Sequence, residues 1–212
     1  HGTSLQTAAV CPSADALQVQ DSVLLRLRIR VPTNALGLEY KFRFFSYEYP
    51  VYLCTQYNDF YLALLSSGHD LIPDDKNISF DAAGNPVTIN SAFFTSCESL
   101  NCNDSVFFPM QQGPDANNDG CVDSLSCNPQ TQLCENQYGA CPDGSDAVQA
   151  FTETQGGGGT DWLTTTAPVI PGEIITLEFH IWDTTDSALD STVLLDAFRW
   201  RSEPTGLNTQ KN

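Results

Sequence analysis

Three segments of the chain alternate between apolar and polar side chains. In 23–31, 38–44 and 175–181, every second residue is apolar, and most of the residues between them are charged or polar. A period of two gives a strand one buried face and one solvated face, which is typical of an antiparallel sheet. The pattern therefore predicts three strands of a β-sandwich.

Shorter apolar runs, bounded by Gly, Pro, Asn and Asp, extend the pattern over 60–65, 78–80, 87–89 and 192–200. No segment has the period of an amphipathic helix. We expect an all-β fold, an antiparallel two-sheet β-sandwich of jelly-roll type. It would form a single domain over 1–203, interrupted by a long insertion at 97–147 and followed by a polar C-terminal tail at 204–212. Four consecutive glycines within 155–160 predict a flexible hinge after the insertion.

The insertion is rich in cysteine and aspartate. The chain has eight cysteines and only three histidines, with no CxxC pair, which favours disulfides over zinc and indicates an oxidising compartment. Spacing leaves the pairing open; one arrangement joins the first two cysteines and keeps the other six, all within the insertion, among themselves. The eight are Cys11, Cys54, Cys97, Cys102, Cys121, Cys127, Cys134 and Cys141.

Within the insertion, 115–123 has the spacing of a calcium-binding loop. In such loops, oxygens come from positions 1, 3, 5, 7 and 9, and a glycine at position 6 allows the turn. The corresponding ligands are Asp115, Asn117, Asp119, the Cys121 carbonyl and Asp123. The usual glutamate at position 12 is replaced by Ser126, so water or another residue must complete the shell. The alternative is a solvated Asx-rich turn.

The formal charge of −17 argues against nucleic acid and anionic membranes as partners, because phosphate binding needs clustered Lys and Arg. No apolar run reaches the length of a membrane span, so direct membrane insertion is not expected. We expect an extracellular or cell-surface location. Self-repulsion among the acids would also be relieved by bound cations such as Ca²⁺.

Five basic residues lie at the polar positions of two successive predicted strands. They either pair across strands with Glu39 and Glu178 or, if the two strands are neighbours, form a basic stripe that docks acidic loops of another subunit. The five are Arg26, Arg28, Arg30, Lys41 and Arg43.

The segment 44–65 contains Phe-Phe-Ser-Tyr-Glu-Tyr-Pro and Tyr-Asn-Asp-Phe-Tyr, which resemble the S-E-Y-P and F-N-D-F-F motifs of choice-of-anchor L domains. Further similar stretches follow at 78–94 and 157–200. The resemblance implies an extracellular bacterial β-domain of a surface protein, without a general catalytic assignment. The chain departs from the family in lacking most of the segment before the first matched strand and in carrying the cysteine-rich loop at 102–134.

The matched motifs are rich in carboxylates. If the two loops that carry them lie at the same end of the sandwich, they could form a second hard-oxygen cation site; otherwise they cap turns. The candidate ligands are Glu48, Asp59, Asp183, Asp186 and Asp190. The first motif also supplies aromatic contacts for a glycan or protein, although about half of these tyrosines should belong to the core: Tyr47, Tyr49, Tyr52 and Tyr57.

Catalytic signals are sparse. The histidines are His1, His69 and His180, and the chain has no G-x-S-x-G, HExxH or P-loop motif. An amino-terminal His1 could hold copper, as in polysaccharide monooxygenases, if His69 or His180 lay close by. We therefore expect a non-enzymatic, calcium-stabilised bacterial surface module for adhesion or glycan and protein binding. The alternatives are a subunit that assembles with copies of itself into an extracellular fibre or layer, by strand donation, and the copper-dependent oxidase.

Overall fold

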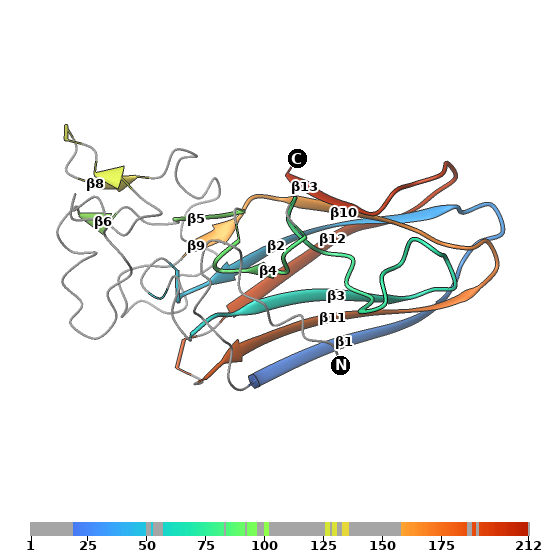
Figure 1. Ribbon diagram of the computed structural model, residues 1–212, viewed down its shortest axis with the longest axis horizontal. Coiled ribbons are helices and arrows are strands. Elements are labelled where there is room, and N and C mark those ends of the chain that lie inside the picture. Colours follow the sequence, from blue (N-terminus) through green and yellow to red (C-terminus); the bar gives the residue numbers. More distant parts are fainter. Residues whose placement is uncertain are drawn as a thin grey trace.

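The computed structural model describes residues 19–49, 52, 57–82, 84–91, 93–96, 100–101, 126–127, 129–130, 133–135, 158–185, 188–189 and 191–211. This part of the chain is all-β and contains thirteen strands (Figure 1). They are β1 (Val19–Arg30), β2 (Gly37–Ser46), β3 (Phe60–Ser66), β4 (Val87–Thr88), β5 (Phe94–Ser96), β6 (Leu100–Asn101), β7 (Ser126–Cys127), β8 (Leu133–Glu135), β9 (Gly158–Thr160), β10 (Leu163–Pro168), β11 (Ile174–Thr184), β12 (Ser191–Arg201) and β13 (Asn208–Lys211). No helix long and apolar enough to cross a membrane occurs among these residues.

Two antiparallel sheets make up the body of the domain. Sheet A has the order β1-β11-β3-β4. Sheet B is centred on β2, which pairs with β10 and β9 along one edge and with β12 along the other; β13 continues beyond β10, and β5 pairs with β9. The two alternating segments at 38–44 and 175–181 thus lie in different sheets, at the centre of β2 and β11.

The two sheets pack face to face through the apolar positions of these strands. In β2, Tyr40 meets Phe179 of β11 edge to face at 5.1 Å, and Phe42 lies 4.4 Å from the Tyr61 ring of β3. Leu38, Tyr40, Phe42 and Phe44 are all buried. The period of two therefore predicted the inward-facing residues of β2 correctly, and the expected pair of antiparallel sheets is confirmed.

The polar face of β2 differs from the expected solvated face. Glu39 is buried because it forms ion pairs with Arg199 and Arg201 of the neighbouring β12. Arg43 is also buried; its Nε donates to the Thr160 carbonyl at 3.0 Å, and its guanidinium lies over the Phe45 ring.

The predicted basic stripe does not form. The chain crosses from sheet A to sheet B between β1 and β2, so the arginines of β1 and the basic residues of β2 belong to different layers. Cross-strand pairing with Glu178 is present instead, because Arg26 forms an ion pair with it between β1 and β11.

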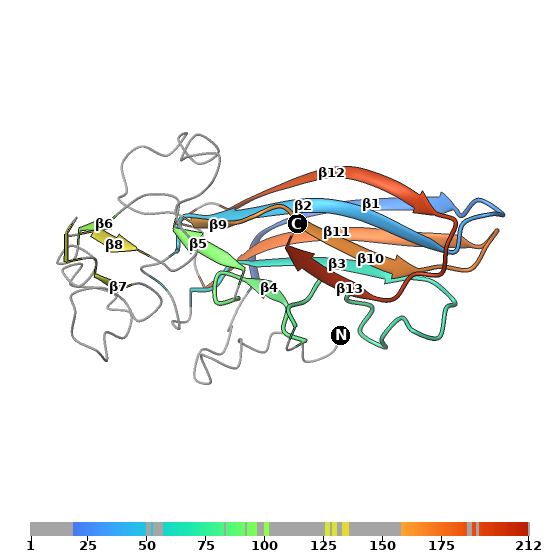
Figure 2. The ribbon, with the colours of Figure 1, turned by 90° about the horizontal axis from the view of Figure 1, so that it is seen from above.

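Two segments expected to be irregular are strands. Residues 208–211, assigned to a polar tail at 204–212, form β13 beside β10 (Figure 2). Gly158–Thr160, assigned to the hinge at 155–160, forms the buried strand β9. Conversely, 78–80 has only one isolated bridge, at Phe80, and a second lies just before it at Asn77.

A chain of buried hydroxyls connects the core to β13. Tyr61 donates to Tyr40 at 3.3 Å, and the hydroxyls of Tyr40 and Ser79 lie 2.6 Å apart. The chain continues through Thr165 to Thr209, whose hydroxyl donates to the Ile78 carbonyl. With each hydroxyl donating to the next, every member is satisfied, which is what burial of polar groups requires.

Replacing Thr165 with Val is expected to destabilise the domain by about 1–3 kcal/mol, because it leaves two buried hydroxyl neighbours short of a partner. Chemical denaturation measures this. Thr166→Val is the matched control, since the hydroxyl of Thr166 donates to Gly206 in an exposed position. Equal losses for both variants would show that the hydroxyl chain contributes nothing specific.

The insertion at 97–147 lies mostly outside the described residues. Its described backbone includes the small sheet β6-β8-β7, in which the register places residues 127 and 134 opposite each other. The predicted disulfides and the other cysteine positions lie outside the described residues.

Candidate metal centre

Four strands meet at one end of the sandwich. β2 ends at Ser46, where it pairs with Ser191 at the start of β12, and β3 begins at Phe60, where it pairs with Trp182 near the end of β11. In Figure 1 these ends lie on the side of β5 and β9. The residues that flank β2 and β3 are thus brought beside the end of β11 and the start of β12, which are distant from them in sequence.

Three carboxylates converge at this end. Glu48 follows β2, Asp59 precedes β3, and Asp183 is the second-to-last residue of β11. The exposed fractions of these three side chains are 1, 0 and 6%, respectively. One oxygen of each lies within 4.8 Å of the others. The condition set for a second cation site, that the loop after β2 and the end of β11 lie at the same end of the sandwich, is therefore met for Glu48, Asp59 and Asp183. Asp186 and Asp190 lie outside the described residues.

Local hydrogen bonds fix these side chains. The Asp59 amide donates to Glu48 Oε2 at 3.1 Å, and the Glu48 amide donates to Ser46 Oγ at 3.0 Å. Ser46 Oγ donates to Asp59 Oδ2 at 2.5 Å, and Ser191 Oγ donates to the same oxygen. Asp59 Oδ1, by contrast, is buried and accepts no hydrogen bond.

Asn58 places Asp59 against β11. Its amide donates to Thr184 Oγ1 at 2.9 Å, and the Thr184 hydroxyl donates back to the Asn58 carbonyl at 3.1 Å. The side-chain amide of Asn58 is 1% exposed and has no hydrogen-bond partner. The adjacent residues Asn58 and Asp59 thus both carry buried polar atoms without a protein partner, which is uncommon in folded proteins and points to an additional group, an ion or water, at this end of the sandwich.

The electrostatics of the cluster are unfavourable without a cation. Burial raises the pKa of Asp59, and the hydrogen bonds from Ser191 and Ser46 only partly oppose it. No Lys or Arg of the described chain forms an ion pair with this carboxylate. Carboxylates this close do not all ionise in a low-dielectric site unless a positive charge balances them.

The donor set suits a hard divalent cation. Ca²⁺ binds six to eight oxygens at about 2.3–2.6 Å, so two of its ligands lie at most roughly 5 Å apart. The three carboxylates meet that limit, and water would complete the shell. Sequence reasoning identified all three but missed Ser46 and Ser191, which donate to Asp59. Both serines lie inside segments that resemble the family, 44–65 and 157–200.

The remaining predicted site residues divide into those the structure places and those it does not. Tyr47 and Tyr49 are buried, so they are not exposed contacts; Tyr52 and Tyr57 are half-buried and form an edge-to-face pair at 5.4 Å. The predicted calcium loop falls outside the described residues: Asp115, Asn117, Asp119, Cys121 and Asp123.

The two described histidines, His69 and His180, lie at different places in the sandwich and do not share a metal site. His180 Nε2 lies 3.3 Å from Glu178 Oε2, on the polar face of β11, and His69 Nδ1 accepts the Leu71 amide in a loop at the opposite end of the sandwich. His1 lies outside the described residues.

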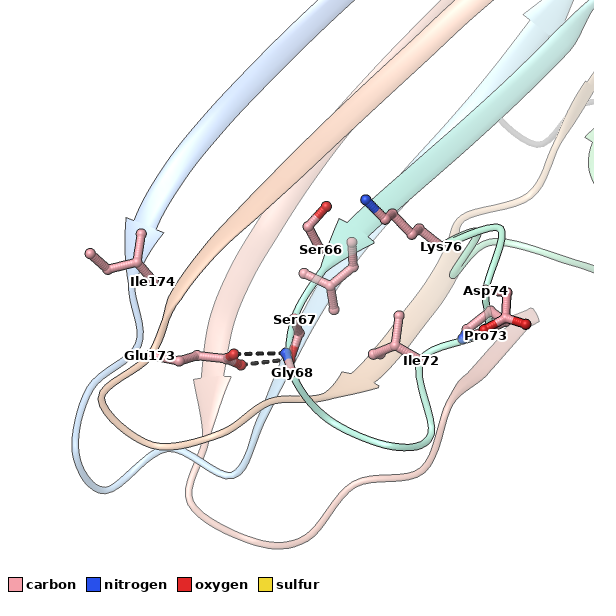
Figure 3. Close-up of a pocket in the computed structure, with 10 residues that line it drawn as sticks. Ser66, Ser67, Gly68, Ile72, Pro73, Asp74, Lys76, Glu173 and Ile174 are labelled. Atoms are coloured by element: carbon pink, nitrogen blue, oxygen red, sulfur yellow. Dashed lines mark hydrogen bonds between the residues drawn. The ribbon is translucent and has the colours of Figure 1, made fainter. Parts of the chain in front are cut away.

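A shallow pocket of about 460 Å³ also lies at that opposite end, between the loop after β3 and the turn before β11 (Figure 3). Its acidic side chain, Glu173, accepts hydrogen bonds from the Ser67 hydroxyl and from the Gly68 and Ile170 amides. Burial alone would raise the pKa of Glu173, but these hydrogen bonds outweigh it and the pKa is lowered. Glu173 therefore links the loop after β3 to the turn before β11 by hydrogen bonds, and its carboxylate is not available as a metal ligand.

Glu173→Gln is expected to destabilise the domain by about 1 kcal/mol at neutral pH, since charge-assisted hydrogen bonds are lost. A lowered carboxyl pKa contributes stability above the unfolded-state pKa, and that contribution is lost as the pH falls through the folded-state pKa. The difference from wild type should thus shrink on acidification. Urea melts over a pH series test this, with the exposed Glu203→Gln as control; a difference that persists in acid would contradict it.

The described residues form a two-layer antiparallel β-sandwich with a buried carboxylate cluster at one end. The family model of the choice-of-anchor L domain matches residues 13–199, and the chain belongs to this family. Family membership makes the protein a bacterial surface-associated module. No curated protein and no solved structure matches the chain.

Proposed function

We propose that the domain is a secreted, calcium-stabilised module of a bacterial surface protein, and that it serves adhesion by binding a glycan or a protein. The observation that carries the calcium proposal is the cluster of Glu48, Asp59 and Asp183, buried and mutually within 4.8 Å, with Asp59 Oδ1 unpartnered. A bound ion would neutralise the cluster and tie the loop after β2 to the ends of β3 and β11.

The ion would also prepare a binding surface. The loop between β2 and β3 covers 47–59, with Glu48 near its start and Asp59 at its end, so both of its ends would be held by the same cation. Tyr52 and Tyr57 lie on this loop and remain half-exposed. Aromatic rings with one apolar face and one polar edge are suited to sugars and to protein partners. Calcium would therefore fix the positions of these two rings.

Calorimetric titration of calcium into metal-free protein tests whether the domain binds the ion and at how many sites. We expect one site that is lost in Asp59→Asn, and a second, independent site lost in Asp119→Asn if the loop at 115–123 also binds. Both variants remove one charge without changing shape. Heats at background level for the wild type would refute the calcium proposal, and full binding by Asp59→Asn would exclude the cluster.

A glycan array probed with calcium and with EDTA tests the binding role. Tyr52→Ala and Tyr57→Ala should lose bound glycans, while the same change at the exposed Leu71 should not. Calcium-independent binding that survives both tyrosine changes would place the ligand elsewhere. Assembly of copies of this chain into an extracellular fibre or layer is the alternative function, and no described residue supports the copper-dependent oxidase.

A further inference from the structure

The pocket at the end of the sandwich opposite the carboxylate cluster contains three polar side chains that the fold does not use (Figure 3). Ser66 is the last residue of β3, and Asp74 and Lys76 lie in the loop that follows it. Within the described part of the chain, none of these three side chains forms a hydrogen bond or an ion pair, in contrast to Glu173. Figure 3 shows the Lys76 ammonium directed toward Ser66. The pocket therefore presents a cationic donor, an anionic acceptor and a hydroxyl.

The loop that forms this pocket is held in place by its own backbone. The Ile72 amide donates to the His69 carbonyl at 3.0 Å. The Lys76 amide donates to the Pro73 carbonyl at 2.8 Å. The Lys76 carbonyl in turn accepts from the Leu65 amide at 2.9 Å, which ties the loop back to β3. The pocket is thus formed before a ligand arrives, as is usual for small-ligand sites.

Lys76 adopts a backbone conformation that lysine rarely takes. Its φ is 64°, in the left-handed region, where a Cβ crowds the backbone and glycine is preferred. The side chain is exposed and does not belong to the described core, so no packing there offsets the strain. Strain that persists without a structural reason points to a functional role. Here the strained residue carries the ammonium of the pocket.

The charges around the pocket favour a neutral ligand. An anion would meet Asp74 and the carboxylate of Glu173, which is ionised at neutral pH since its pKa is lowered. A cation would meet Lys76. Hydroxyl groups suit both signs, because one hydroxyl can accept from an ammonium and donate to a carboxylate. The apolar side chains of Ile72 and Ile174, the latter 45% exposed, suit the C–H face of a sugar ring.

We propose that this pocket binds a neutral sugar residue of a glycan. The Lys76 ammonium donates to a sugar oxygen, Asp74 accepts from a sugar hydroxyl, and Ser66 does either. Because the pocket is shallow, the rest of the glycan chain can extend into solvent. The proposal rests on the glycan-binding role proposed above, but it names a second site at the other end of the sandwich, which needs neither calcium nor the tyrosine pair of the loop between β2 and β3.

An array of neutral, acidic and amino-sugar glycans, probed in EDTA, tests this site without calcium. We expect wild-type protein to retain neutral glycans. By calorimetry with a glycan that the array identifies, Lys76→Gly should bind about tenfold or more weakly, because a charge-assisted hydrogen bond is lost. Since glycine relieves the left-handed strain, Lys76→Gly should melt at a temperature at least as high as that of wild type. Unfolding would then not explain the lost binding.

Two aspartates of the same loop provide a matched control. Asp74→Asn should also weaken binding, whereas Asp70→Asn should bind like wild type, because Asp70 is exposed and does not line the pocket. The proposal would be overturned if no glycan were bound in EDTA, if acidic or amino sugars were preferred, or if Lys76→Gly bound as tightly as wild type.

The two glycan sites are distinguished by opposite responses. Glycans bound in this pocket should survive Tyr52→Ala and Tyr57→Ala and be lost in Lys76→Gly. Glycans that are lost in EDTA and in the tyrosine variants, but kept by Lys76→Gly, would support the tyrosine site alone and contradict this one. Failure of either proposal thus has its own signature.

Discussion

Removing calcium from the wild-type protein is expected to lower its melting temperature by about 5–10 °C. An ion at a concentration near 100 times its dissociation constant adds about 2.7 kcal/mol to the free energy of unfolding, and 1 kcal/mol moves the midpoint of a domain of this size by about 2–4 °C. Differential scanning fluorimetry with calcium and with EDTA measures the shift. Identical curves would refute a structural ion.

Asp59→Asn should abolish this shift and raise the stability of the metal-free protein. The amide can still accept from the hydroxyls of Ser46 and Ser191, while one of three buried negative charges disappears. Asp70→Asn, an exposed aspartate in the loop after β3, is the control and should keep the full response to calcium. A calcium response in Asp59→Asn equal to that of wild type would exclude Asp59 as a ligand.

The same cluster predicts a distinctive pH dependence. Burial raises the pKa of Asp59, so the folded metal-free protein takes up a proton at a higher pH than the unfolded chain does. Its stability should accordingly increase as the pH falls through the folded-state pKa, until the unfolded pKa of about 4 is reached. Protons also compete with calcium, so the calcium-dependent shift should shrink over that range. Asp59→Asn isolates this group from Glu173 and Glu178, whose pKa values are lowered.

Gly159→Val is expected to destabilise the domain by about 3 kcal/mol, which is the second large effect. A Cβ at this position would lie 2.5 Å from Cδ1 of the buried Phe45 ring and 3.2 Å from the Phe44 carbonyl oxygen. Relief would require β9 to separate from β2 or the ring to move, and overpacking of this kind costs about 1–3 kcal/mol. Because valine is β-branched, we expect the loss of unfolding free energy to lie at the upper end of this range.

Gly206→Val is the matched control, because a Cβ there meets nothing within 4 Å and the backbone has no positive φ. Thermal melts of the two variants should differ by roughly 6–12 °C. If Gly159→Val melted like the control, Gly158–Thr160 would be a hinge after all, as the run of glycines alone suggests.

The sandwich was predictable from sequence wherever one face of a strand is buried. Alternation placed β2 and β11 and named the inward residues Tyr40, Phe42 and Leu177 without further information. It failed at β9, since glycine has no side chain to reveal a pattern. It also failed at β13, where Thr209 is the one buried residue and is held by a hydroxyl chain rather than by apolar contact.

For the candidate site, the sequence determined which residues could supply ligand oxygens, and the tertiary structure determined which of them lie close together. The motifs around Glu48, Asp59 and Asp183 identified hard-oxygen donors, but 124 positions separate Asp59 from Asp183, and no local rule brings them together. Only the antiparallel pairing of β3 with β11 and of β2 with β12 does so. The exposure of Val23 and Leu25 in β1 has the same origin. Alternation shows that these residues share a face with the core residues of β11, whereas only the packing of the two sheets decides how far they are covered.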